Sequence, residues 1–340
     1  MNDSDFLALL ETAPQNERIY KYLLSMRQKL SSYNRIAVSY SGGSDSDIVM
    51  DLMELARPDD CGEVKYVFFD TQFEYDATYR HISFVEEKYG ITVVRRIPKM
   101  SIPAACKKHG VPFIAKIVSS RLEGLQRHSF NWAPNFESAK IEGPCAAGLN
   151  WFYNKNSKPK KGESDQFNIS KFRMLSDFIV EYPPTFAISD KCCDYTKKYP
   201  AKDFNDEYVP DLVILGLRQS ESGRRIASRS SCFKPRGGER NFDEFCPLWF
   251  WTDTDKKTYK QWRGLRNSDC YEIWGMKRTG CIGCPCNSRA EQELKIISKF
   301  EPKKAKAAYA VFGESYEYRR KYSLFKKHGG LDQIALEGYE

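Results

Sequence analysis

Short apolar segments alternate with helical patterns between residues 15 and 97, and this alternation restricts the possible fold more than any other feature of the chain. A further apolar segment, at residues 211–216, predicts one more strand of the same sheet. Strands joined by helical crossovers pair in parallel, so this order predicts an α/β fold with a doubly wound, mainly parallel sheet. The predicted strands are residues 35–40, 64–70 and 91–97, and the predicted helices are residues 15–31, 48–55 and 77–89.

Changes in composition predict how the rest of the chain is organised. Residues 118–185 are rich in Asn, Lys, Ser and aromatic residues and predict a mostly helical insertion or lid. Residues 288–327 combine a helical pattern with an excess of basic residues. The predicted segments are an N-terminal helical segment at 1–32, a first half of the core at 33–117, the insertion at 118–185, a second half of the core at 186–290 and a basic helical C-terminal region at 291–340.

Charge and cysteine content bear on the compartment and on the partners. The 340 residues carry a formal net charge of +8, which permits a nucleotide or nucleic-acid partner but is too small to establish one. No run approaches the roughly 18 apolar residues of a membrane span, and the N-terminus has no secretory pattern, so we expect a cytoplasmic protein without a membrane partner. Thiols stay reduced there, so the eleven cysteines favour metal or iron–sulfur ligation over disulfides.

The loop between the first core strand and the helix after it has the composition of a phosphate cradle. Its two glycines let the backbone approach an anion, and the helix N-terminus offers free N–H groups and a positive dipole end. No Gly-Lys-Ser/Thr follows, so this is not the P-loop of kinases and GTPases. The alternative is a flexible Ser/Gly turn. The residues concerned are Ser39, Ser41, Gly42, Gly43, Ser44, Asp45 and Ser46.

A second polar loop follows the strand predicted at residues 211–216. Guanidinium groups bind phosphate or sulfate oxygens in pairs, and a glutamate can hold an arginine in place. The carboxyl end of a parallel strand is where such sheets bind ligands, although a solvated basic loop is the alternative. The residues concerned are Gly216, Arg218, Glu221, Arg224 and Arg225.

Four cysteines stand in two close pairs that are far apart in the sequence. Cys192 and Cys193 are adjacent, whereas Cys281 and Cys284 form Cys-x-x-Cys with Cys286 just beyond. A lone Cys-x-x-Cys suits a redox dithiol or half of a zinc site, but adjacent cysteines are unusual zinc ligands, and a cubane cluster needs four converging thiolates. A cluster, zinc and free thiols therefore stay open. Single cysteines, predicted to be small buried side chains, are Cys61, Cys106, Cys145, Cys232, Cys246 and Cys270.

These patterns together resemble one enzyme family. Ser-Gly-Gly-x-Asp-Ser resembles the PP-loop of the ATP pyrophosphatase (adenine nucleotide alpha hydrolase) superfamily, and Phe69-Asp70-Thr71-Gln72 resembles the Asp-Thr-Gly of its phosphoadenylyl-sulfate (PAPS) reductase branch, with Gln72 in place of Gly. The arginine loop resembles a second signature of that branch, with Arg218 and Arg225 at the matching positions. Residues 247–255 resemble its Pro-Leu-x-x-Trp-Thr-x-x-Asp element, to which we give a structural role with Thr252 as a helix N-cap.

The resemblance implies a nucleotide site, a metal ion and a cluster. It implies that the two loops and Asp70 bind ATP or an adenylyl-sulfate nucleotide, that Asp45, Arg218 and Arg225 serve catalysis, and that Asp45 or Asp70 engages Mg²⁺. The paired cysteines resemble those of cluster-binding adenylyl-sulfate reductases, and Arg-Thr-Gly-Cys-x-x-Cys resembles DNA-phosphorothioation and phage relatives. This implies a 4Fe–4S cluster on Cys192, Cys193, Cys281 and Cys284.

The chain departs from the reductases at its end. Those enzymes carry a nucleophilic cysteine near the C-terminus, whereas no cysteine follows Cys286 here. We therefore expect an enzyme that cleaves ATP between the α and β phosphates and activates an acceptor, favoured to be nucleic acid, for sulfur transfer from a donor such as a cysteine desulfurase. The alternatives are a sulfonucleotide reductase with an atypical cysteine, and a non-catalytic sensor of nucleotide and cluster.

Histidines and basic runs give weaker signals. None of the four histidines is spaced for a metal site or a triad, so His81, His109, His128 and His328 are predicted to be surface or packing residues. Basic residues between 303 and 327 predict either a solvated helix face or a nucleic-acid track with stacking aromatic rings. The interleaved aromatic residues are Tyr309, Phe312, Tyr316, Tyr318, Tyr322 and Phe325.

Overall fold

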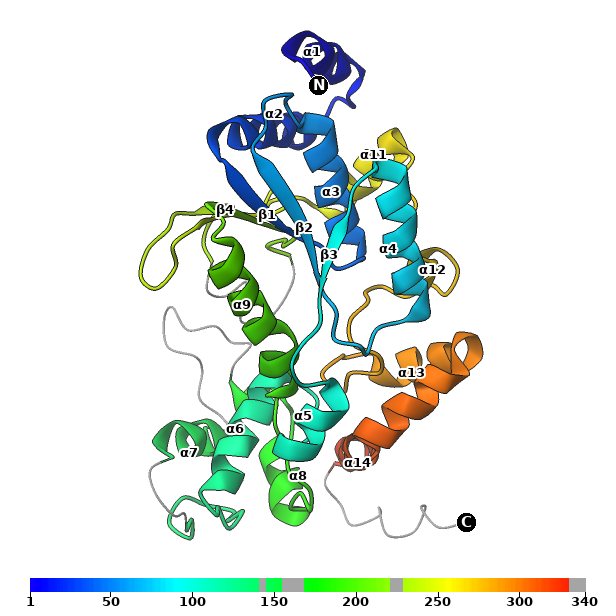
Figure 1. Cartoon of the computed structure of the whole chain (residues 1–340). Coiled ribbons are helices and arrows are strands. Elements are labelled where there is room, and N and C mark those ends of the chain that lie inside the picture. Colours follow the sequence, from blue (N-terminus) through cyan, green and yellow to red (C-terminus); the bar gives the residue numbers. More distant parts are fainter. Residues whose placement is uncertain (141–144, 155–167, 221–228, 330–340) are drawn as a thin grey trace. The chain divides into compact units, whose positions relative to one another are not determined.

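The computed structural model describes residues 1–140, 145–154, 168–220 and 229–329 (Figure 1). The chain divides into two compact units. The first unit consists of Met1–Lys99 and Lys197–Gly280, and the second consists of Met100–Thr196 and Cys281–Glu340. None of the described helices is long and apolar enough to cross a membrane.

The first unit contains a six-stranded sheet with the order β3-β2-β1-β4-β6-β5 (Figure 1). Every neighbouring pair of strands is parallel except β5 and β6, so the predicted mainly parallel α/β sheet is confirmed, with one antiparallel edge strand. The strand order reverses between β1 and β4, and open α/β sheets bind ligands at the carboxyl side of such a point. The strands are β1 (Arg35–Ser39), β2 (Glu63–Phe69), β3 (Val93–Arg96), β4 (Leu212–Leu215), β5 (Phe233–Lys234) and β6 (Asp243–Phe245).

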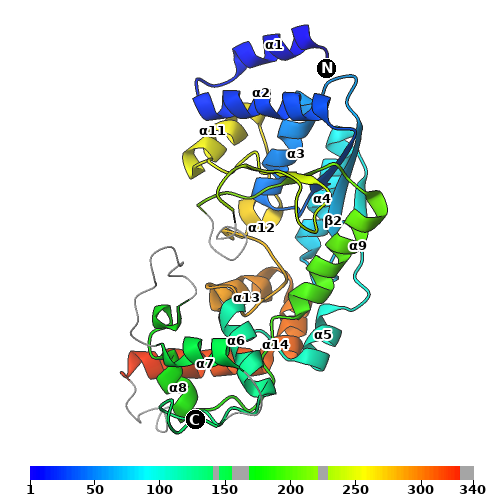
Figure 2. The same cartoon turned by 90° about the vertical axis from the view of Figure 1, so that its left-hand side faces the viewer.

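Helices cover both faces of the sheet, as a doubly wound fold requires. Side chains alternate along a strand, so Ile36 and Val38 of β1 face one layer and Ala37 faces the other. The first layer includes α2, α3, α4 and α11, and the second includes Phe204 of α9 (Figure 2). The helices of this unit are α1 (Asp3–Thr12), α2 (Glu17–Ser32), α3 (Ser44–Ala56), α4 (Asp76–Tyr89), α9 (Tyr199–Tyr208), α11 (Asp253–Arg263) and α12 (Asp269–Glu272).

The second unit is helical. An aromatic cluster forms its core, in which the ring of Phe178 lies 4.8 Å from that of Tyr318 and 5.2 Å from that of Tyr322. The predicted helical character of the insertion and of the C-terminal region is confirmed for the residues of both that the structure describes. The helices are α5 (Ile102–His109), α6 (Lys116–Arg127), α7 (Ala146–Tyr153), the 3-10 turn η2 (Ile169–Lys171), α8 (Leu175–Glu181), α13 (Ala290–Phe300) and α14 (Pro302–Lys327), and the short π-helical turn η3 (Asp194–Lys198) spans the boundary with the first unit.

Burial of the α14 rings corrects one prediction made from the sequence. Phe312, Tyr318, Tyr322 and Phe325 are at most 9% exposed, so these rings belong to the core. The interpretation in which they stack on nucleic-acid bases is therefore wrong for these four residues. Tyr309 differs, because 53% of it is exposed.

The predicted N-cap of α11 is confirmed by a reciprocal capping box. The hydroxyl oxygen of Thr252 accepts a hydrogen bond from the Asp255 backbone N–H at 3.2 Å, and the Asp255 carboxylate accepts one from the Thr252 backbone N–H at 2.8 Å. Asp255 also accepts a hydrogen bond from Asn16 of the segment before α2. The cap therefore fixes both the start of α11 and its position against α2.

We expect Thr252→Ala to lower the free energy of unfolding by about 1 kcal/mol, because the first turn of α11 loses its cap. Thr254→Ala, at an exposed position of the same turn, is the matched control and should change stability little. Urea denaturation of the two variants measures the difference. Equal stabilities would contradict a capping role for Thr252.

Candidate functional site

The loop between β1 and α3 is closed by the side chain of Ser46. Its hydroxyl accepts a hydrogen bond from the Gly43 N–H at 3.0 Å and donates one to the Gly43 carbonyl at 2.8 Å, and the Ser41 hydroxyl lies 3.1 Å away. Gly42 has a φ of +65°, and a Cβ there would lie 2.9 Å from Thr78. Only glycine fits both the conformation and the space at this position.

The end of β4 meets this loop. A Cβ on Gly216 would lie 3.3 Å from the Asp45 carbonyl carbon and from the Ser46 nitrogen, so the two backbones are in close approach. Two residues later, the Arg218 Nε lies 3.4 Å from the Asp45 Oδ2. The loop and Arg218, which carry two separate sequence signatures, therefore lie together in the first unit.

Asp45 holds two cations. Besides Arg218, the ammonium of Lys256 on α11 forms an ion pair with the Asp45 Oδ1. Arg218 also donates to Asp253 at 2.7 Å. Burial by itself would lower the pKa of Arg218, but the charge of Asp45 and the contact with Asp253 outweigh it and raise that pKa. Lys256 was missed from the sequence, because the segment before it was given only a structural role.

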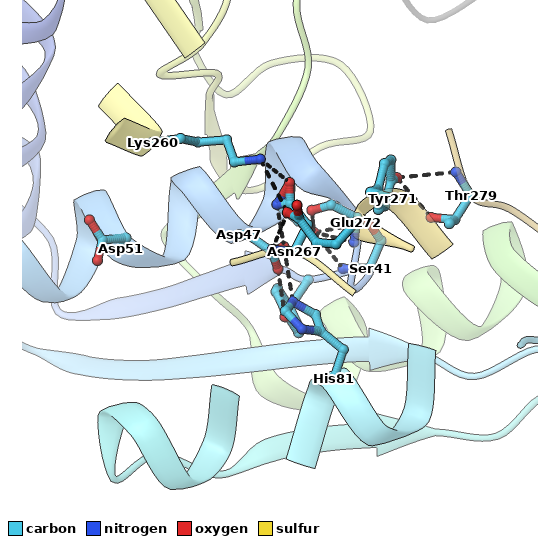
Figure 3. Close-up of polar contacts among 12 residues, drawn as sticks. Ser41, Asp47, Asp51, His81, Lys260, Asn267, Tyr271, Glu272 and Thr279 are labelled. Carbon is cyan, nitrogen blue, oxygen red and sulfur yellow. Dashed lines mark hydrogen bonds and ion pairs between the residues drawn. The ribbon is translucent and has the colours of Figure 1, made fainter. Parts of the chain in front are cut away.

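A buried polar network lies beneath the loop (Figure 3). Asp47, in the first turn of α3, is 5% exposed and accepts a hydrogen bond from the Tyr40 hydroxyl at 2.8 Å. Its other contacts are the His81 Nε2 at 2.9 Å and the Asn267 Nδ2 at 3.4 Å. Burial, followed by the charge of Asp47, raises the pKa of Tyr40 well above its usual range. His81 is thus a buried partner of a carboxylate, which its position in the sequence did not reveal.

A tyrosine hydroxyl lies at the N-terminus of α3. Tyr271 Oη is 3.0 Å from the Thr279 hydroxyl, accepts a hydrogen bond from the Thr279 N–H at 3.1 Å and has a further hydrogen bond with the Ser44 backbone (Figure 3). A Cβ on Gly43 would lie 3.3 Å from the same oxygen. Polar side chains of the α12 region therefore complete the surroundings of the loop. Thr279 belongs to the Arg-Thr-Gly-Cys pattern noted in the sequence.

The remaining predicted nucleotide-site residues lie elsewhere in the first unit or outside the described residues. Ser39 ends β1. Asp70 follows β2, and its Oδ1 accepts hydrogen bonds from the Gln72 N–H at 2.8 Å and from the Tyr79 hydroxyl at 2.7 Å. Gln72 has a φ of +57°, the left-handed conformation that glycine adopts easily in the family motif. Three further predicted residues lie outside the described part of the chain: Glu221, Arg224 and Arg225.

Thiols gather in the second unit. Cys192 is hydrogen-bonded to Cys106 of α5 and to Cys193, and these contacts raise the pKa of its thiol. Cys284 and Cys286 are hydrogen-bonded to each other, and both interact electrostatically with Cys193. This hydrogen bond lowers the pKa of the Cys284 thiol and raises the pKa of the Cys286 thiol. Cys106 was predicted to be a small buried side chain, which it is, but its thiol partner was missed.

The chemistry of these thiols fits an iron–sulfur cluster. Thiolates are the ligands that such clusters use, and thiols from two distant segments interact here. Among the described residues, however, no three Cys, His, Asp or Glu side chains are placed to hold a metal ion. We therefore derive no reaction step through a cluster.

Comparison with known proteins gives the family. The model of the phosphoadenosine phosphosulfate reductase domain matches residues 35–117 and 153–287, which make up more than half of the chain. The chain belongs to this family. Both signature loops, β1 to β4 and the cysteine pairs lie within the matched residues of this PAPS reductase family member. No curated protein matched the chain.

Two solved structures resemble this family member weakly. A PAPS reductase from Candida auris, in a phosphate complex, is 16% identical, covers 83% of this chain and 96% of its own, and has a TM-score of 0.44. The U34-tRNA thiolase NcsA from Methanococcus maripaludis, with its [4Fe-4S] cluster, is 11% identical and has a TM-score of 0.36. The match covers 92% of this chain and 79% of the thiolase chain. Similarities this low do not assign an activity.

We expect His81→Ala to lower the free energy of unfolding by about 3 kcal/mol, because the buried Asp47 carboxylate loses a partner. His81→Gln is the matched variant, since the glutamine amide can donate from nearly the position of the imidazole Nε2. His81→Gln should keep most of the stability that His81→Ala loses. Urea denaturation checks both variants, and an equal loss in the two would contradict a stabilising role for the hydrogen bond to Asp47.

Proposed function

We propose that this protein binds an adenine nucleotide at the loop of residues 41–46 and cleaves ATP between the α and β phosphates to activate an acceptor for sulfur transfer. One observation carries the proposal. Arg218, from the end of β4, pairs with Asp45 of the loop, so the two signatures of the family form one polar site in the first unit. Family membership supports the adenine-nucleotide part of the proposal.

Positioning and charge stabilisation provide the catalysis in this proposal. The N–H groups at the start of α3 and the positive end of its dipole attract phosphate oxygens. The Arg218 guanidinium stabilises the negative charge that develops as the bond to the β phosphate breaks. The Arg225 guanidinium, outside the described residues, is proposed for the same role.

Asp45 fits a magnesium ion better than Asp70 does. The Oδ1 of Asp45 is buried and contacts the flexible Lys256 side chain, which can move away, whereas the Oδ1 of Asp70 accepts two hydrogen bonds from Gln72 and Tyr79. Carboxylate oxygens are the protein ligands that Mg²⁺ prefers. When bound, Mg²⁺ would neutralise part of the phosphate charge.

The cluster stays part of the proposal as a cofactor. Cys192, Cys193, Cys281 and Cys284 are the proposed ligands, and Cys286 is the alternative because its thiol contacts Cys284 and interacts with Cys193. When bound, such a cluster supplies redox or sulfur-binding chemistry. A nucleic acid is the proposed acceptor and a cysteine desulfurase is an example of the proposed donor. The proposal of a nucleic-acid acceptor now depends on the basic surface residues, since most of the aromatic rings of α14 are buried.

A sulfonucleotide reductase is the second candidate. The family model itself describes a PAPS reductase domain. In this candidate an internal cysteine such as Cys286 or Cys145 replaces the missing C-terminal nucleophile, and the observation that favours it is the hydrogen bond between Cys286 and Cys284, which brings two thiols together. In that reaction, the thiolate attacks the sulfur of the adenylyl sulfate, the bond from this sulfur to the phosphate oxygen breaks and the nucleotide leaves. The added thiol then attacks the cysteine sulfur and releases sulfite, leaving a mixed disulfide.

Product analysis separates the two candidates. Anaerobically prepared protein is incubated with labelled ATP, with and without nucleic acid, and separately with PAPS and a thiol. Pyrophosphate release that depends on nucleic acid supports sulfur transfer, whereas thiol-dependent sulfite release supports the reductase and contradicts the first proposal. Nucleotide binding without turnover of either substrate points to a sensor.

We expect Arg218→Met to lower the rate of the active reaction by about a hundredfold, because a preorganised charge at the phosphates is lost. Arg266→Met, at an arginine whose side chain is 65% exposed, is the matched control and should leave the rate unchanged. Initial rates of pyrophosphate or sulfite release measure the effect. If both variants keep the wild-type rate, Arg218 has no role in the reaction.

We expect anaerobically purified protein to contain about four irons per chain and to absorb broadly in the visible range. Cys193→Ser should lose most of this iron, since the residue interacts with both Cys284 and Cys286. Cys61→Ser, in the first unit, is the control and should keep it. Iron assays on Cys281→Ser and Cys286→Ser identify which of these two thiols is a ligand, and full iron in Cys193→Ser would refute the proposed set.

A further inference from the structure

Lys256 is a cation at the candidate nucleotide site that neither the motifs nor the sequence pattern identified. It follows the capping box of α11, and its ammonium pairs with Asp45 of the loop at residues 41–46. We propose that Lys256 is a nucleotide-binding residue whose ammonium contacts the phosphate that enters this loop. This inference rests on the proposed nucleotide site and adds a residue to it.

The start of α11 holds Lys256 at a defined position. Asp255, the residue before it, is 3% exposed and accepts hydrogen bonds from Thr252 and from Asn16. The neighbouring Trp251 and Tyr259 are fully buried in the core between the sheet and its helices. The backbone at Lys256 is therefore fixed on both sides, and only the four-carbon side chain can change direction.

The charges around Asp45 leave an excess of positive charge. The side chains of Arg218 and Lys256 are only 12% and 15% exposed, and both pair with the one carboxylate of Asp45. Asp253, the second partner of Arg218, is 91% exposed and is screened by water. Two largely buried cations thus share one largely buried anion beside the positive end of the α3 dipole. Such a group is stabilised by a further anion.

The ion pair of Lys256 is suited to exchange. Among the described residues, the Lys256 ammonium has one carboxylate partner, Asp45, whereas Arg218 is paired with both Asp45 and Asp253. A phosphate oxygen that enters the loop competes with Asp45 for the ammonium. Lys256, rather than Arg218, is the cation whose partner changes, because the hydrogen bond to Asp253 fixes the direction of the guanidinium even though water screens the charge of Asp253.

Equilibrium binding tests the proposal with a closely matched control. The dissociation constant of ATP is measured in EDTA for the wild type, Lys256→Met and Lys257→Met. Lys257 is the next residue on α11 and is exposed, so its variant removes the same charge from nearly the same place. We expect Lys256→Met to raise the dissociation constant at least tenfold and Lys257→Met to raise it less than about threefold. Adenosine, which has no phosphate, should bind both variants alike.

A second variant separates phosphate binding from a structural role. If Lys256 only neutralises Asp45, Lys256→Met loses its effect once Asp45→Asn has removed that charge. If Lys256 contacts phosphate, Lys256→Met still raises the dissociation constant of ATP about tenfold in the Asp45→Asn background. Thermal unfolding of each variant shows that it is folded.

The outcomes distinguish this inference from the proposed function. A wild-type protein that binds neither ATP nor PAPS overturns the nucleotide site and Lys256 together. A wild-type protein that binds ATP, with Lys256→Met binding as tightly as Lys257→Met, overturns only the role of Lys256. If Lys256→Met weakens ATP binding in the wild-type background but not in the Asp45→Asn background, the role of Lys256 is likewise overturned and the nucleotide site is not.

Discussion

Two buried carboxylates on α3 hold the first unit together around the loop. Asp47 and Asp51 are one helical turn apart and lie on the same side of α3. Asp47 binds His81 of α4 and Asn267, while Asp51, which is 1% exposed, accepts hydrogen bonds from Tyr89, Tyr259 and Arg263. A carboxylate without partners is very costly to bury, so each must keep its set of donors. The contacts of α3 with α4 and α11 therefore fix the direction in which the loop residues point.

Asp47 and Asp45 separate a fixed part of the site from an exchangeable part. Asp47 lies under the loop in a closed set of hydrogen bonds that no ligand needs to break. Asp45, two residues earlier, faces Arg218 and Lys256 and forms an ion pair with each of them. Positions two residues apart in one helix turn thus serve scaffold and ligand, because their side chains leave the helix in different directions.

The strands β1, β2 and β4 could be predicted from the sequence, because each contains three successive buried apolar residues, and β3 begins with two valines. The short strands β5 and β6 could not, since they are two and three residues long and Asp243-Glu244-Phe245 has no apolar pattern. The proximity of Arg218 to the loop of residues 41–46 could also be predicted, because both follow the carboxyl ends of parallel strands. The pairing of His81 with Asp47, 34 residues apart, had no local signal.

The loop lacks the lysine of a P-loop and carries Asp45 instead, so its positive charge has to come from other parts of the chain. Arg218 is 173 residues away in sequence and comes from the end of β4, and Lys256 comes from α11. Each cation reaches the loop only if its own element is correctly packed. Because Asp51 binds Tyr259 and Arg263 of α11, this buried carboxylate also controls where Lys256 lies. The packing of the core and the position of the cations at the loop are therefore coupled through α3 and α11. This coupling accounts for the buried carboxylates of α3 and their hydrogen-bond donors.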